Sequence, residues 1–187
     1  INMSFGKRFG SHKQVVDEAV AYAEKKGVLL VHAAGNSSED NDTAPNFPNA
    51  RLFQKGGKQR LATNWIEVGA SSKRGRPANF SNFGQKSVHV FAPGVGINST
   101  APGNNYKRAD GTSMASPVTA GVAALLKSYY PTLLPLQMRS ILIETVVKQK
   151  SLTRKSISGG IVNALNAMES LDEFFQQQQQ ESLLGAL

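Results

Sequence analysis

Residues 11–36 read SHKQVVDEAVAYAEKKGVLLVHAAGN, and this stretch decides the fold class. Ser11 and Gln14 match a capping box at the start of a helix, and Gly27 is placed to end it. One apolar stripe recurs at helical spacing between them, formed by Val15, Val16, Ala19, Val20 and Ala23. The run 28–31 that follows is apolar on both faces, as in a strand buried between helices. A helix followed at once by a buried strand indicates an α/β fold with a parallel sheet.

The sequence outside this stretch continues the same pattern. Alternating apolar residues predict strands, and small and apolar residues at a spacing of three and four predict buried helices. The expected elements are strands over 65–70 and 87–92 and helices that begin at Thr112, at Pro135 and at Ile161. The segment 37–64 is rich in proline, glycine and polar residues and is expected to be loop. These elements are expected to form one domain over residues 1–175, followed by a glutamine-rich, flexible tail over 176–187.

Composition and charge exclude several function classes. The 187 residues include no cysteine, which excludes disulfides and zinc–thiolate sites. The net charge is +8, but the lysines and arginines are dispersed and no aromatic residues interleave them, so a solvated surface is expected rather than a nucleic-acid interface. No apolar run approaches the roughly 18 residues that span a bilayer. We therefore expect neither nucleic acid nor membrane as a partner.

The heptapeptide Gly111–Pro117, GTSMASP, is the strongest chemical signal in the chain. It begins the buried helix, where free backbone amides and the positive end of the helix dipole stabilise a nearby oxyanion. Gly111 allows a sharp turn into the helix, and Pro117 is tolerated in a first turn that needs no amide donor. In isolation a serine-rich helix start is more often a simple cap, but the length of this string favours a nucleophile.

This heptapeptide resembles the nucleophile signature of the subtilisin family of serine proteases, the subtilases. The resemblance makes Ser113 the serine that attacks the peptide carbonyl. Ala33-Ala34-Gly35-Asn36 is a second match, and it makes Asn36 the side-chain donor to the oxyanion. On its own the pair Gly35-Asn36 would be read as a turn.

A third match, Met3-Ser4-Phe5-Gly6, resembles the family segment that lies beside extended substrate and pairs with its backbone. The resemblance places Ser4, Phe5 and Gly6 on one side of the specificity pocket, and Ala33, Ala34 and Gly35 on the other. The small side chains at 33–35 suggest a roomy pocket for large apolar groups. Further similarity through VGA at 68–70, NFSNFG at 79–84, FAPG at 91–94 and GGIVNA at 159–164 extends the resemblance over roughly residues 1–170.

The resemblance implies a three-layer α/β subtilisin-like fold with a mostly parallel sheet, its N-terminal part missing. A subtilase serine needs a histidine base and an aspartate that orients it, and both precede the serine in the family order. The three histidines of this chain are His12, His32 and His89, and none lies in the His-Gly-Thr-His context of the family. All three are expected to be structural. No Asp-Ser-Gly or Asp-Thr-Gly string is present either, so the triad Asp and His are expected upstream of Ile1.

These observations predict a serine endopeptidase that hydrolyses extended peptide or protein substrates through an acyl-enzyme on Ser113. The isolated chain is expected to be inactive, and to pair with its missing N-terminal fragment or to self-associate. The alternative is a pseudoprotease or peptide-binding module that holds peptides without cutting them. No cofactor is required; a structural calcium ion is common in the family, with Glu39, Asp40 and Asp42 as the nearest, unconvincing ligands. The family resemblance also implies a secreted or periplasmic protein.

Overall fold

A six-stranded sheet organises the chain in the computed structural model, which describes residues 1–53 and 56–184. The strand order is β1-β2-β5-β6-β10-β9, and every neighbouring pair is parallel except β10 and β9. The strands are β1 (Asn2–Met3), β2 (Leu30–Ala33), β5 (Trp65–Ser71), β6 (Val90–Pro93), β9 (Val147–Lys148) and β10 (Gly160–Ile161). The expected α/β class with a mostly parallel sheet is therefore confirmed.

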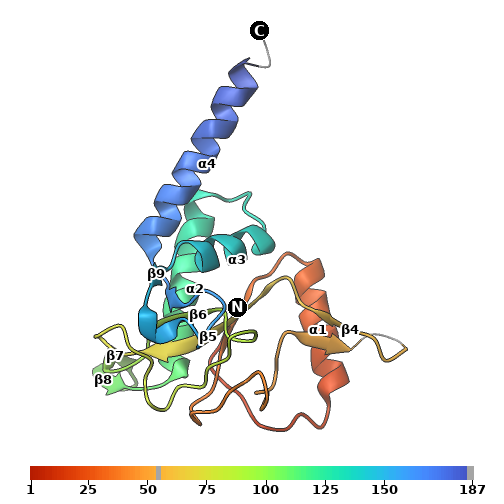
Figure 1. The fold of residues 1–187 in the computed structure, drawn as a ribbon, viewed down its shortest axis with the longest axis vertical. Coiled ribbons are helices and arrows are strands. Elements are labelled where there is room, and N and C mark those ends of the chain that lie inside the picture. The colour runs from red at the N-terminus through yellow and green to blue at the C-terminus, as the bar shows by residue number, and fades with distance from the viewer. Residues whose placement is uncertain (54–55, 185–187) are drawn as a thin grey trace.

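Helices cover both faces of this sheet, as Figure 1 shows. On one face Val31, Ile66 and Val68 pack in a core with residues of α2, α3 and α4. On the other face Leu30 and Trp65 pack with Val20 of α1. Adjacent residues of one strand thus enter different cores, which is why β2 and β5 are buried along their whole length. The helices are α1 (Lys13–Lys25), α2 (Thr112–Tyr129), α3 (Pro135–Glu144) and α4 (Ala164–Leu184), with a 3₁₀ turn, η1 (Lys150–Leu152).

The first helix differs from its expectation in two respects. It begins at Lys13, with His12 rather than Ser11 at the N-cap and no side-chain cap, so the predicted capping box is wrong. The hydroxyl of Ser11 instead contacts the His12 ring. Only part of the predicted apolar stripe is buried, because Val20 enters the core while Val15 and Val16 remain 64% and 41% exposed.

Several elements lie where the sequence predicted loop, where it predicted no element, or at other boundaries. Two hairpins, β3 (Arg51–Phe53) with β4 (Gln59–Leu61) and β7 (Ile97–Ala101) with β8 (Asn105–Ala109), are short and mostly exposed, so they carry no apolar periodicity. The last helix begins at Ala164 because Ile161 pairs with Phe91 in the sheet. It continues past residue 175 to Leu184 and projects from the body of the molecule (Figure 1). None of the helices described is long and apolar enough to cross a membrane.

Candidate active site

Ser113 lies in the first turn of α2, half-buried against the end of β1. Gly111 precedes the helix with φ of 153°, a backbone conformation that favours glycine. The Ser113 hydroxyl donates to the carbonyl oxygen of Ser4 at 3.1 Å, and the Ser4 hydroxyl donates to the carbonyl oxygen of Ser113 at 2.8 Å. The predicted nucleophile is therefore joined directly to the predicted substrate-pairing segment.

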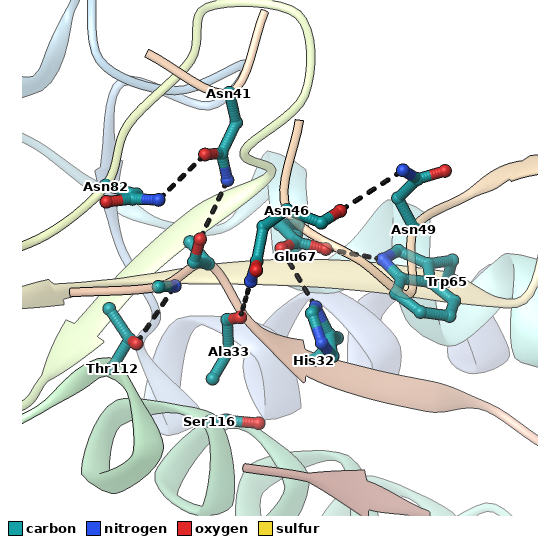
Figure 2. Close-up of polar contacts among 12 residues, drawn as sticks. His32, Ala33, Asn41, Asn46, Asn49, Trp65, Glu67, Asn82, Thr112 and Ser116 are labelled. Atoms are coloured by element: carbon teal, nitrogen blue, oxygen red, sulfur yellow. Dashed lines mark hydrogen bonds and ion pairs between the residues drawn. The ribbon is translucent and has the colours of Figure 1, made fainter. Parts of the chain in front are cut away.

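Asn36 follows β2 and points its amide at the same helix start. Its Oδ1 accepts from the Thr112 amide and from the Thr112 hydroxyl, both at 2.9 Å. The Thr112 hydroxyl in turn accepts from the amide of Gly35 at 3.1 Å (Figure 2). With the carbonyl oxygen fixed by Thr112, both N–H groups of the Asn36 amide have no acceptor among residues 1–53 and 56–184 and are available to an oxyanion.

A cavity of about 260 Å³ opens beside Ser113. The predicted site residues that line it are Phe5, Gly6, Ala33, Gly35, Asn36 and Ser113. Two predicted residues, Ser4 and Ala34, do not line this cavity. Ser4 is hydrogen-bonded to Ser113, and Ala34 is fully buried in a core with Val88 and Phe91. The structure thus brings most of the predicted site together around one cavity.

Sequence reasoning missed two asparagines that line this cavity, Asn46 and Asn82. The Asn46 amide donates to the Ala33 carbonyl at 3.2 Å (Figure 2), and a Cβ on Gly6 would lie only 2.5 Å from it. Polar amides therefore occupy space that the small residues 33–35 suggested would be roomy and apolar. Asn82 lies in the quoted NFSNFG string, which was a usable signal, whereas Asn46 lies in the segment expected to be loop and carried none.

The Asn82 amide fixes the loop after β2. Its Oδ1 accepts from the amides of Ser37 and Glu39, and its Nδ2 donates to Asn41 at 2.9 Å. Asn41 then donates to the Ala34 carbonyl, as Figure 2 also shows. This buried amide chain holds the strand end that carries Asn36.

None of the three histidines is hydrogen-bonded to Ser113. The His12 ring contacts Ser11, and His89 Nδ1 accepts from the amide of Glu67. Burial, together with the charge of Arg139, lowers the pKa of His89 to about 3, so this ring is neutral. His32 has both ring nitrogens engaged, with Glu67 Oε1 and with the Phe5 carbonyl oxygen. Within the described residues, Ser113 has no base.

The carboxylates weighed as calcium ligands make internal contacts. Asp42 accepts from the amide of Lys86 and the hydroxyl of Ser87, Asp40 accepts from the amide of Asp42, and Glu39 pairs with Arg8. Across the part of the chain that the structure describes, no three His, Asp or Glu side chains are grouped as metal ligands would be.

Comparisons with known proteins agree with this geometry. The model of the subtilase family matches residues 1–168. Alkaline elastase YaB of a Bacillus species is 39% identical over 163 residues, which cover 87% of this chain and 38% of that protein. Subtilisin DY of Bacillus licheniformis is 41% identical over 148 residues, which cover 78% of this chain and 48% of that protein. Subtilisin-like protease 2 of Plasmodium falciparum is 36% identical over 174 residues, 90% of this chain and 12% of that protein.

Solved structures give the same result. The S218A mutant of the protease domain of PatA superposes with a TM-score of 0.74 and 30% identity, over 92% of this chain and 59% of that one. A cold-adapted subtilisin-like serine proteinase superposes with a TM-score of 0.68 and 32% identity, over 83% of this chain and 53% of that one. The chain spans less than two thirds of each of these relatives and structures.

Proposed function

Because this chain belongs to the subtilase family, we propose that it supplies the nucleophile, oxyanion donor and substrate-pairing segment of a serine endopeptidase. The observation that carries the proposal is the convergence of Ser113, the fixed amide of Asn36 and the cavity at one helix start. The substrate is an extended peptide or protein, because segment 4–6 runs beside the cavity and the backbone amide and carbonyl of Gly6 have no partner among residues 1–53 and 56–184.

In the proposed reaction the Ser113 oxygen attacks the peptide carbonyl carbon while a histidine base removes its proton. The developing oxyanion accepts from Asn36 Nδ2, whose orientation Thr112 fixes, and from the backbone amide of Ser113, which has no acceptor among the described residues. Collapse of the tetrahedral intermediate expels the amine and leaves an acyl-enzyme, which water hydrolyses. Only protons and the acyl group move, so we expect the chemistry to require no cofactor.

The base and its aspartate are proposed to come from a polypeptide segment N-terminal to Ile1. Two features support docking of such a segment here. Among residues 1–53 and 56–184, β1 pairs with β2 alone, so its other edge has no strand partner there. Beside it, an apolar groove of about 570 Å³ runs between β1 and α1 and is lined by Ile1, Met3, Phe5, Val16 and Ala19, among others. Without that segment we expect the chain to be inactive and to self-associate through this surface.

A second candidate is a peptide-binding pseudoprotease. The observation that favours it is the absence of a base on Ser113 within the described residues. The free amide of Asn36 favours the protease instead, because a site that only holds peptides needs no oxyanion donor. We also propose a secreted or periplasmic location, which the family resemblance implies.

The test is to read the coding region immediately upstream of Ile1 and to assay the complete product on peptide p-nitroanilides. An Asp-[Ser/Thr]-Gly segment followed by His-Gly-Thr-His, with hydrolysis that Ser113→Ala abolishes, is the expected result. A start codon or unrelated sequence there, with peptide binding but no hydrolysis, would establish the pseudoprotease instead.

A further inference from the structure

A buried ionic pair lies beneath the substrate-pairing segment, and the proposed reaction does not use it. His32 of β2 and Glu67 of β5 are neighbours in register on adjacent parallel strands, and both side chains are buried. Figure 2 shows the Glu67 carboxylate between the His32 ring and the Trp65 indole. The contacts are 2.9 Å from His32 Nδ1 to Glu67 Oε1 and 2.7 Å from Trp65 Nε1 to Glu67 Oε2.

The hydrogen-bonding partners of His32 define its protonation state. Nδ1 faces a carboxylate oxygen, and Nε2 faces the carbonyl oxygen of Phe5 at 2.7 Å. A neutral imidazole has only one N–H, so its other nitrogen would direct a lone pair at an acceptor. Glu67 Oε2 accepts from Trp65 Nε1, and Oε1 is placed to accept from a protonated His32 Nδ1. The arrangement is satisfied by an imidazolium–carboxylate pair with two charge-assisted hydrogen bonds.

The charged surroundings are compatible with this assignment. His89 accepts from the Glu67 amide and is neutral, while Arg139 of α3 donates to the Trp65 carbonyl. The other cations that line the same cavity as Glu67 are Arg51, Arg60 and Lys86, and Arg60 pairs with Glu24. On the α1 side, Lys13 and Asp17 pair with each other. Burial alone would lower the pKa of His32, but the charge of Glu67 and the hydrogen bonds to Glu67 and Phe5 raise it.

The Phe5 carbonyl connects this pair to the proposed substrate site. Phe5 is the central residue of segment 4–6, which leaves the sheet after Met3 and is next held by the bridge between Lys7 and Phe47. Between these points the backbone is anchored by Ser113 at the Ser4 carbonyl and by His32 at the Phe5 carbonyl. The imidazolium thus holds the middle of the segment from its inner side.

We propose that the His32–Glu67 pair is a positioning device that fixes segment 4–6 for peptide binding, and that this binding weakens when His32 loses its proton. The inference rests on the proposed function, since it concerns the same segment. The Glu67 carboxylate holds the proton on Nδ1, so deprotonation occurs at Nε2, leaves a lone pair facing the Phe5 carbonyl and releases the segment from His32. Loss of one charge-assisted hydrogen bond of this kind corresponds to at most about ten- to a hundredfold weaker peptide binding.

The experiment is an NMR titration of the isotopically labelled chain between pH 5 and 10. Long-range ¹H–¹⁵N spectra report the protonation of the His32 ring, and the Phe5 carbonyl and Gly6 amide shifts report the segment. The expected result is that both His32 nitrogens are protonated at pH 7 and that the Phe5 and Gly6 signals move with the His32 midpoint. Binding of a fluorescein-labelled tetra-alanine peptide, followed by anisotropy, is expected to weaken over the same pH interval.

Variants of His32 and Glu67 distinguish a positioning role of this pair from a purely structural one. Glu67→Gln is expected to shift the His32 midpoint and the pH dependence of peptide binding to lower pH together, and His32→Gln to remove that dependence. His12→Gln, the same change at an exposed histidine, is the matched control and is expected to leave both unchanged. The titration of the unmodified chain needs no variant to fold.

The proposed positioning role is wrong if the His32 ring carries only one N–H at pH 7, even if peptide binds. It is also wrong if the Phe5 and Gly6 signals do not change as His32 titrates. Peptide affinity that stays constant through the His32 midpoint would also overturn it. If the Phe5 and Gly6 signals do follow the His32 titration but no peptide binds at any pH, the proposed function is wrong. The claim that peptide affinity depends on His32 then fails with it.

Discussion

Ser4 and Ser113, which are 109 residues apart in the sequence, exchange two hydrogen bonds, each hydroxyl donating to the other residue's carbonyl oxygen. The pair joins β1 to the first turn of α2. It therefore ties the proposed substrate-pairing segment to the proposed nucleophile, so that a peptide aligned on one residue is presented to the other. One of the two bonds also gives the Ser113 hydroxyl proton an acceptor in the absence of a base, and this proton must pass to the base during attack.

The side-chain amide of Asn36 offers a sharp test of the oxyanion assignment. Asn36→Ala removes the donor and also the acceptor of Thr112, whereas Asn36→Asp keeps an Oδ1 for Thr112 but replaces the donor with a negatively charged oxygen. Both variants of the complete product are expected to lose about 10²–10³-fold in kcat, the magnitude known for such a donor in subtilisin itself. Steady-state kinetics check this. If Asn36→Asp retained full kcat, the oxyanion role would be wrong.

Asn46 is predicted to restrict the side chain that enters the cavity. Asn46→Ala removes the amide that lies against Gly6 and Ala33 and enlarges the pocket. The ratio of kcat/KM for a phenylalanyl over an alanyl p-nitroanilide is expected to rise by about tenfold, the lower end of the effect of one methylene in a pocket. Asn79→Ala, at an exposed asparagine outside the lining, is the control and should leave the ratio unchanged. An unaltered ratio in Asn46→Ala would exclude this role.

Glu24 links α1 to the segment 60–63, and its ionisation predicts an acid sensitivity. Burial alone would raise its pKa, but hydrogen bonds from Arg60 and Thr63 lower it to about 2. A folded-state pKa below the unfolded value of 4.5 stabilises the fold above pH 4.5, and this contribution is lost as the pH falls towards 2. Glu24→Gln is expected to cost about 1–2 kcal/mol at pH 7 and much less at pH 2.5.

Urea unfolding at the two pH values measures this difference. Glu18→Gln, on the exposed side of the same helix, is the matched control and should change stability little at either pH. An equal cost of Glu24→Gln at both pH values would show that shape rather than charge matters at this position.

The groove between β1 and α1 is predicted to drive self-association of the isolated chain. Val16 lines it and is 41% exposed; Val147, in the strand at the opposite edge of the sheet, is also 41% exposed. Val16→Lys is expected to shift the chain towards monomer, because a charge within an apolar contact loses its hydration. Val147→Lys should leave the distribution unchanged. Sedimentation velocity distinguishes the two, and a wild-type chain that is monomeric at all concentrations would contradict the prediction.

The sequence by itself determined the α/β class and the chemistry of the helix start. The periodicities of the helix and strand in 11–36 indicate a layered, mostly parallel sheet, and the motifs GTSMASP and AAGN identify Ser113 and Asn36 as candidate site residues. These features are local, since periodicity and turn chemistry lie within a few residues of one another. The exposed hairpins carried no such periodicity and were missed.

Only the tertiary structure decided which polar groups meet. Asn46 enters the cavity from a segment without a recognisable pattern, and Ala34 turns into the core although its neighbours line the cavity. The sequence placed His32 within a buried strand but did not indicate the partners of its ring. In the structure both ring nitrogens face oxygen atoms, one of the Glu67 carboxylate and one of the Phe5 carbonyl. Hydrogen bonds between distant segments depend on strand order and register, which no short stretch of sequence encodes by itself.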